Sequence, residues 1–250
     1  MTTLAVDIGN HRTKIALISQ GDEIVHRRHF LTVEIEGQLD AVVQMLDESS
    51  ADGIAIGSVV PTATELLLGA LTKYKPLVVT GSTPCELTVD YTPAESLGAD
   101  RLAAAVGAYR EYGKVIKKAT MIVDAGSTIT ADIVGPAGTY RGGAILPCEE
   151  LSLRALHDGA AQLPKVEFKP PQIAIGSNTE ECMLVGVKAL VIGAIEKLYS
   201  QYGEAVGEHP FLVLTGASAA WIATELQIPH MVDPDVVLLG LSAIWSFNNE

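Results

Sequence analysis

The sequence predicts an α/β protein made of two related halves, each with a mixed sheet flanked by helices. Short apolar strands alternate with helical patterns along all 250 residues. The strand that runs into Asp7-Ile-Gly9-Asn10 has a counterpart that runs into Asp124-Ala-Gly126-Ser127. Each Asp is followed six residues later by a Thr and then by an apolar run. The two copies predict two domains of common origin, residues 1–118 and 119–250.

In the first half, each element is predicted from a local signal. The first copy of the repeat is a β-hairpin whose turn needs glycine for a positive φ angle. Pro61 is typical of the first position of a helix. Leu102, Val106 and Tyr109 follow helical spacing. The expected elements are strands at 4–7, 15–18 and 24–33, a helix at 38–49, a strand at 51–60, a helix at 61–74, strands at 77–80 and 86–90, and a helix at 99–112.

In the second half, the repeat gives another hairpin, and Gly-Pro-Ala-Gly at 135–138 predicts the turn that follows it. Ser177-x-x-Glu180 resembles a capping box at the start of a long helix. The expected elements are strands at 121–124, 128–134 and 139–146, helices at 149–162 and 177–199, a strand at 211–214, a helix after 215–218, and a final helix at 235–247.

Composition excludes several classes of protein. The net charge is −13 and no Lys/Arg cluster large enough for nucleic acid is present. Apolar residues make up 48% of the chain, so it is not disordered. Neither a signal peptide nor a stretch of 18 apolar residues is found, so we expect no membrane partner. The cysteines, Cys85, Cys148 and Cys182, are few and widely spaced, which favours a reducing cytoplasm over a disulfide framework.

His26 and His29 have a spacing that could suit a metal ion, but no Cys or carboxylate clusters with them. A solvated strand or loop is the favoured interpretation of this segment.

The Asp-x-Gly turns are common turn chemistry when they occur singly, but as a pair they indicate phosphate binding. Backbone N–H groups of Gly9 and Asn10, and of the turn 126–128, can bind phosphates without basic side chains. Asp7 and Asp124 add carboxylates that could hold a metal ion. Two such turns facing each other across an interdomain cleft would clamp a nucleotide tail, as phosphoryl transfer requires. No P-loop or dinucleotide fingerprint is present.

Two further candidates remain open. Lys14 follows the first turn and either reaches a phosphate or faces solvent. Gly98-Ala-Asp100-Arg101 combines a glycine that permits close approach, a carboxylate near a helix N-terminus and an arginine that could pair with an anion. Spacing alone favours a helix cap and a surface arginine for the last two residues.

Taken in order, the motifs resemble those of type III pantothenate kinases. They are Asp7-Ile-Gly-Asn10 with Thr13-Lys14, Tyr91-Thr-Pro with Leu97-Gly-Ala-Asp-Arg101, Asp124-x-Gly126 with Thr130-x-Asp132, Gly142-Gly143-Ala-Ile-x-Pro147, and Asn178-Thr179-x-Glu181. That family belongs with acetate and sugar kinases, heat-shock chaperone ATPases and actin. The resemblance covers nearly the whole chain and implies two ribonuclease-H-like (actin-like) domains with a cleft between them.

The resemblance also implies a reaction: ATP-dependent phosphorylation of pantothenate to 4′-phosphopantothenate, the first step of coenzyme A biosynthesis. It implies a homodimer, Mg²⁺ bound with ATP, and a monovalent cation, K⁺ or NH₄⁺, held by Asp124. The implied ATP contacts are Asp7, Ile8, Gly9, Asn10, His11, Arg12, Thr13, Lys14 and Ser127. The implied pantothenate contacts are Tyr91, Gly98, Ala99, Asp100, Arg101 and Thr179, with Asp100 as the proton acceptor and Thr179 supplied by the second subunit.

Four residues depart from the family pattern: His11, Ser127, Cys148 and Ala217. Ser127 keeps the hydroxyl of the usual Thr, whereas Cys148 and Ala217 add side chains where the family commonly has glycine. These departures leave two alternatives open. One is a catalytically weak relative that binds nucleotide and regulates another process, and the other is a kinase of a different small hydroxy acid.

Overall fold

The computed structural model describes residues 2–249, which divide into two compact units. Unit 1 contains residues 2–117, 134–142 and 235–249, and unit 2 contains residues 118–133 and 143–234. The first boundary lies one residue from the one predicted from the repeat. Two segments beyond it nevertheless group with unit 1. Packing shows which segments lie together and not which share an origin, so the ancestral division at 118/119 stays a prediction.

Unit 1 is built on a five-stranded sheet with the order β3-β2-β1-β4-β5. The strands β1, β2 and β3 pair antiparallel, whereas β4 and β5 add in parallel beside β1. Their bounds are β1 Thr3–Ile8, β2 Arg12–Ile18, β3 Ile24–Leu31, β4 Gly53–Ser58 and β5 Leu77–Val78. The predicted mixed sheet is confirmed in this unit.

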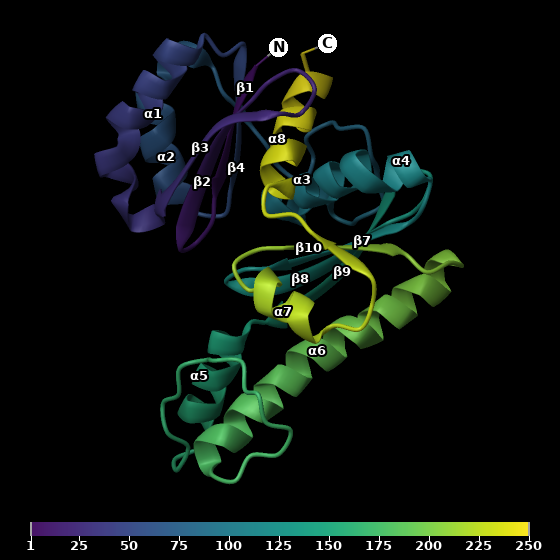
Figure 1. The fold of residues 1–250 in the computed structure, drawn as a ribbon. Helices are drawn as coiled ribbons and strands as arrows, with labels where there is room; N and C mark the ends of the chain where they lie inside the picture. Colours follow the sequence, from purple (N-terminus) through teal and green to yellow (C-terminus); the bar gives the residue numbers. More distant parts are fainter. Residues whose placement is uncertain (1, 250) are drawn as a thin grey trace. The chain divides into compact units, whose positions relative to one another are not determined.

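Helices cover both faces of this sheet (Figure 1). On one face, α1 (Ile35–Ser49) and α2 (Pro61–Ala70) pack on the alternate strand residues Leu4, Val6 and Ile8. On the other face lie α3 (Ala99–Ala108) and α8 (Val236–Phe247), which contact the strands through small residues. Side chains alternate between the faces of a strand, so bulky and small residues alternate along β1.

The helices α3 and α8 pack closely because glycines lie where they cross. A β-carbon on Gly240 would collide with the Ala103 carbonyl and lie 3.0 Å from the Gly107 nitrogen. A β-carbon on Gly107 would in turn meet the backbone of Val236. On the sheet, Gly53 lies against the Trp245 ring in the same way. The C-terminal helix is therefore a closely fitted part of unit 1.

Unit 2 repeats the strand order of unit 1. Taken from the same edge as in unit 1, its sheet has the order β9-β8-β7-β10-β11, so β7 to β11 take the places of β1 to β5. At the edge next to β9, the short strand β6 (Thr88–Val89) pairs with the start of β9. The bounds are β7 Thr120–Ala125, β8 Thr128–Val134, β9 Thr139–Pro147, β10 Phe211–Thr215 and β11 His230–Val232. Burial also repeats: β1 and β7 share one pattern, and β2 and β8 share another. The predicted internal repeat is confirmed.

One detail of the predicted repeat is wrong. The second turn is one residue shorter, since β2 begins at Arg12 after Ile8 whereas β8 begins at Thr128 after Ala125. By strand position Thr130 therefore corresponds to Lys14, and Thr13 corresponds to Ile129.

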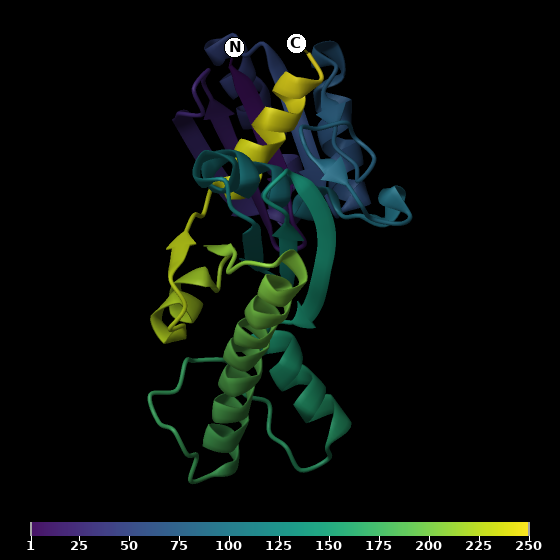
Figure 2. The same cartoon turned by 90° about the vertical axis from the view of Figure 1, so that its right-hand side faces the viewer.

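The helices of unit 2 are α5 (Glu149–Gly159), α6 (Thr179–Val206) and α7 (Ala219–Glu225). The middle of α6 and the face of α7 join the core of the sheet, through Val191, Ile195 and Ile222. Figures 1 and 2 show the first turns of α6 beside α5, at the end of α6 remote from the strands. A separate small core of Leu153, Met183 and Val187 joins these two helices.

Most helix and strand predictions are confirmed within a few residues, and the differences have local causes. The first helix begins at Ile35 because a 3-10 turn, Thr32–Glu34, ends the shortened β3. After α3 the chain continues as a π-turn, Tyr109–Gly113, and a last turn, α4 (Lys114–Ile116). The long α6 is capped by Asn178, not by Ser177, and β11 was not predicted. None of the helices in residues 2–249 has the length and apolarity needed to span a membrane.

Candidate active site

The first turn of the repeat joins β1 to β2 and is held by Thr32 at the end of β3. The Gly9 N–H donates to the Arg12 carbonyl at 3.0 Å, while the Thr32 hydroxyl donates to the Gly9 carbonyl at 2.7 Å. The Thr32 N–H donates to the His11 carbonyl at 3.0 Å. Thr32 therefore fixes both sides of the turn, and nothing in the sequence pattern pointed to it.

Side chains of the predicted ATP loop fall into two groups. Ile8 and Thr13 are fully buried, and the Thr13 hydroxyl lies 3.1 Å from that of Thr32. Since the Thr32 hydroxyl already donates to Gly9, Thr13 is the donor in this pair. These two residues support the turn from below. Asn10, His11 and Arg12 are exposed at its tip.

Asp7 and Lys14 are directly opposed across β1 and β2, which puts both side chains on one face of the sheet. Gly57 of β4 is the partner of Asp7 on its other side and adds no side chain there. Both charged residues are half-buried. Lys14 lies beside the turn and Asp7, and its two interpretations, a phosphate contact and a solvent-facing side chain, both stay predictions.

The third candidate lies at the start of α3, where Gly98 is the N-cap residue. Asp100 is half-buried, and its Oδ1 accepts the Arg101 N–H at 2.8 Å. A side chain on Gly98 would collide with this oxygen. The carboxylate is thus held at the helix N-terminus, where the helix dipole favours negative charge.

Arg101 is not the surface residue that spacing alone suggests, because only 7% of it is exposed. Its guanidinium lies 5.6 Å from the centre of the Tyr91 ring, a cation–π arrangement. Tyr91 in turn lies 6.1 Å from the ring of the buried Tyr140. Gly142, with a φ of +85°, gives Tyr91 its space, since a β-carbon there would lie 3.3 Å from the ring. Tyr140 was not predicted as a site residue.

The second turn of the repeat, in unit 2, is built around Asp124. The Gly126 N–H donates to the Thr128 carbonyl at 3.0 Å, and Ser127 is half-buried at the tip. Gly216, with a φ of +92°, lies against this turn: its β-carbon would be 2.5 Å from Asp124 Oδ1. A carboxylate oxygen flanked by backbone fits a cation bound by oxygen ligands.

Thr179 lies apart from this turn within unit 2. It is exposed at the first position of α6, the end that Figure 2 shows beside α5 and away from the strands. The Ser177 N–H and hydroxyl both donate to Glu181, at 2.8 and 2.7 Å, and lower the pKa of Glu181. The capping glutamate is thus Glu181 and not the predicted Glu180, so Thr179 opens a well-ordered helix.

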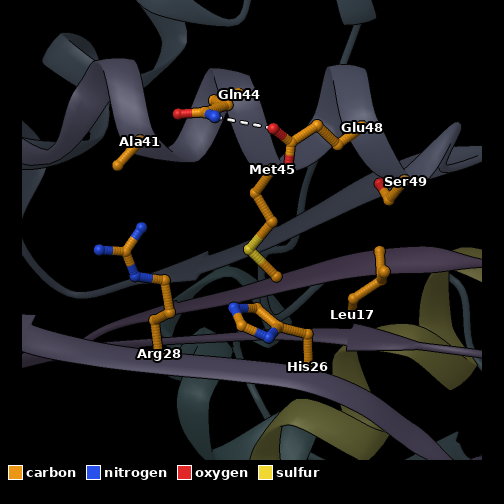
Figure 3. A pocket seen from close by; sticks show the side chains of 8 residues that line it. All are labelled: Leu17, His26, Arg28, Ala41, Gln44, Met45, Glu48 and Ser49. Carbon is orange, nitrogen blue, oxygen red and sulfur yellow. Dashed lines mark hydrogen bonds between the residues drawn. The ribbon is translucent and has the colours of Figure 1, made fainter.

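A cavity of about 340 Å³ in unit 1 contains none of these residues (Figure 3). It lies between β3 and α1 and is lined by Leu17, His26, Arg28, Ala41, Gln44, Met45, Glu48 and Ser49. His26 pairs with Leu17 whereas His29 pairs with Lys14, so the two histidines point to opposite faces. Among the described residues no three His, Cys, Asp or Glu side chains gather as metal ligands. Of the favoured interpretations of this segment, a solvated strand or loop, the structure shows the strand, since most residues of β3 are exposed.

Comparisons with known proteins agree with the motifs. A family model described as type III pantothenate kinase matches residues 3–201. A type III pantothenate kinase of Syntrophus aciditrophicus is 30% identical over 98% of this chain and 99% of its own. The kinase of the same name from Akkermansia muciniphila is 34% identical, over 96% and 97%.

Solved structures show the same fold at lower identity. A Campylobacter jejuni protein described as a member of the Baf family has a TM-score of 0.62 and 20% identity, and each chain is covered over 98%. The activator of 2-hydroxyisocaproyl-CoA dehydratase from Clostridium difficile, solved with ADPNP, has a TM-score of 0.54 and 12% identity. It is matched over 95% of its length by the whole of this chain. The predicted pair of actin-like domains with mixed sheets is confirmed.

Proposed function

Because the chain belongs to the type III pantothenate kinase family, it phosphorylates pantothenate with ATP, and we propose how its residues divide this work. The two Asp-x-Gly turns bind the ATP phosphates, and the start of α3 binds pantothenate. The observation that carries this division is the matched pair of turns, each at the end of the first strand of its sheet. We place the enzyme in the cytoplasm because its three cysteines, Cys85, Cys148 and Cys182, are free thiols, as a reducing compartment favours.

In the proposed reaction, the primary hydroxyl of pantothenate attacks the γ-phosphorus of ATP. An oxygen–phosphorus bond forms, the bond to the β-phosphate oxygen breaks, and ADP leaves. Asp100 accepts the hydroxyl proton, and Arg101 binds the pantothenate carboxylate while Tyr91 packs beside it. Mg²⁺ bound with ATP neutralises charge on the phosphates. Backbone N–H groups of both turns, with Lys14 and Ser127, orient them.

The departures from the family pattern bear on the alternatives. His11 and Ala217 are exposed at turn tips, where their side chains project away from the core. Cys148 is buried as the N-cap residue of α5. All three departures lie at other positions than the charged site residues of the proposal, and Asp7, Asp100, Arg101 and Asp124 are all present. A coupled ADP-release assay with and without pantothenate tests the function: release without pantothenate, or with another hydroxy acid only, would contradict it.

We expect faster turnover in K⁺ or NH₄⁺ than in Na⁺. A single carboxylate beside backbone, as Asp124 is beside Gly216, suits a large and weakly hydrated cation, whereas Mg²⁺ keeps its water and travels with ATP. The measurement is kcat in the three chloride salts at equal ionic strength. Asp124→Asn should weaken the cation response more than it changes the KM for pantothenate. Equal rates in sodium and potassium would contradict this assignment.

We expect a homodimer in which Thr179 reaches the pantothenate site of the other subunit. Support comes from the exposed position of Thr179 at the remote end of α6 and from exposed apolar residues such as Leu190 farther along that helix. Light scattering at micromolar concentration should give twice the monomer mass of 26.4 kDa. A mixture of Asp100→Asn and Thr179→Ala chains should be more active than either alone, because each heterodimer then contains one complete site. A monomer mass would contradict the proposal.

A further inference from the structure

Glu149, the first residue of α5, is a buried carboxylate that the proposed reaction does not use. Only 1% of it is exposed, whereas its neighbour Glu150 is exposed. Its Oε1 accepts hydrogen bonds from the Ser218 hydroxyl and from the Trp221 indole, the latter at 2.8 Å. Its Oε2 is buried and makes no hydrogen bond in the described structure.

Such a carboxylate costs stability. Burying a charged group without satisfying both oxygens is unfavourable, and an apolar side chain of similar size would fill the space at lower cost. Packing alone therefore gives no reason for a glutamate at this position. Glu149 accepts one hydrogen bond from Ser218, just before α7, and one from Trp221 within α7. An apolar residue could accept neither.

Those two bonds fix the segment that contacts Asp124. Ser218 immediately precedes α7, and its N–H donates to the Ala125 carbonyl at 3.0 Å. Two residues earlier, the backbone of Gly216 lies against the Asp124 carboxylate. A chain of direct contacts thus runs from Glu149 through Ser218 to the turn that contains Asp124. Every residue in it belongs to unit 2.

We propose that Glu149 is a positioning residue for ATP, which holds Ser218 and Gly216 so that the Asp124 turn has the shape that the phosphates and the cation require. This inference rests on the proposed assignment of that turn to ATP. It predicts an effect on ATP that does not extend to pantothenate, whose proposed contacts in this chain are made mainly by other elements.

Steady-state kinetics separate positioning from general support of the fold. Glu149→Ala should raise the KM for ATP about tenfold, as removal of an outer-shell partner typically does, and change the KM for pantothenate less than twofold. Glu149→Gln should stay within about threefold of the parent protein, because its carbonyl still accepts from Ser218 and Trp221. Glu150→Ala, which removes the adjacent exposed carboxylate, is the matched control and should behave like the parent.

A binding measurement does not depend on turnover. The chain has two tryptophans, so a Trp245→Phe background leaves Trp221 as the only indole, hydrogen-bonded to Glu149. ADP should change the fluorescence of Trp221, and Glu149→Ala should shift the titration midpoint to about tenfold higher ADP. If the parent protein binds ADP but does not phosphorylate pantothenate, the proposed function fails while this inference stands.

Two results would overturn the inference. One is an unchanged KM for ATP in folded Glu149→Ala. The other is an equal rise in both KM values, which would indicate a structural role only. If Glu149→Ala does not fold, Ser218→Ala removes one donor and leaves the carboxylate in place. Ser218→Ala should then raise the KM for ATP selectively, and a folded Ser218→Ala protein with parental kinetics would contradict the proposal.

Discussion

Asp100→Asn should lower kcat by about 10²- to 10⁴-fold, the usual contribution of a general base, while the KM for ATP changes little. Asparagine has nearly the same shape, and its Oδ1 can still accept the Arg101 N–H that Asp100 accepts at 2.8 Å. The start of α3 should therefore keep its conformation. What is lost is the proposed acceptor of the proton from the pantothenate hydroxyl. In a loose transition state this proton moves late, so a weakly basic carboxylate suffices.

Two further variants make this result specific. Glu95→Gln removes an exposed carboxylate from the nearby turn Ala94–Ser96 and should leave kcat unchanged. Arg101→Ala should instead raise the KM for pantothenate, because it removes a carboxylate contact from ground and transition states alike. If Asp100→Asn keeps near-normal turnover, Asp100 is a helix-capping residue and not the base.

Gly240→Ala should produce a large loss of stability in unit 1. The added methyl group would overlap the Ala103 carbonyl and lie 2.7 Å from its carbon, so α3 and α8 would have to move apart. Overpacking of this kind typically costs about 1–3 kcal/mol and occasionally more. For a chain of this size we expect Tm to fall by roughly 2–12 °C.

The matched control is Gly69→Ala in α2, where nothing lies within 4 Å of the added carbon. It should be neutral or raise stability by about 0.5–1 kcal/mol through helix propensity. Urea unfolding monitored by circular dichroism gives both values. Equal midpoints for the two variants would show that α3 and α8 do not pack at this glycine.

The internal repeat made most of the fold predictable, because each copy consists of short local sequence patterns: an apolar run, an Asp-x-Gly turn and a second apolar run. Features set by tertiary packing were not predictable in the same way. The shift of Thr130 to the position of Lys14 depends on a single residue of turn length. The three-residue β11 pairs with β10, and a segment of three residues is too short to show the alternation that predicts a strand.

Prediction of the candidate site followed the same division. Residues in motifs, such as Asp7, Asp100 and Asp124, could be selected because their chemistry and spacing are visible in the sequence. The burial of Arg101 could not, since it depends on Tyr91 from a segment with no regular pattern. Thr32 and Glu149 could not be predicted from the sequence, because each supports a turn that is distant from it along the chain.

The place of α8 has a consequence for synthesis on the ribosome. The sheet of unit 1 is complete once β5 has been made, and α3 follows soon after, but α8, which lies on the same face as α3, is made only after all of unit 2. At about 5–20 residues per second, synthesis of α8 follows that of β5 by on the order of ten seconds. A nascent chain thus exposes the part of this face that α8 covers while all of unit 2 is being made. Unit 1 therefore receives α8 only after every element of unit 2 has been made.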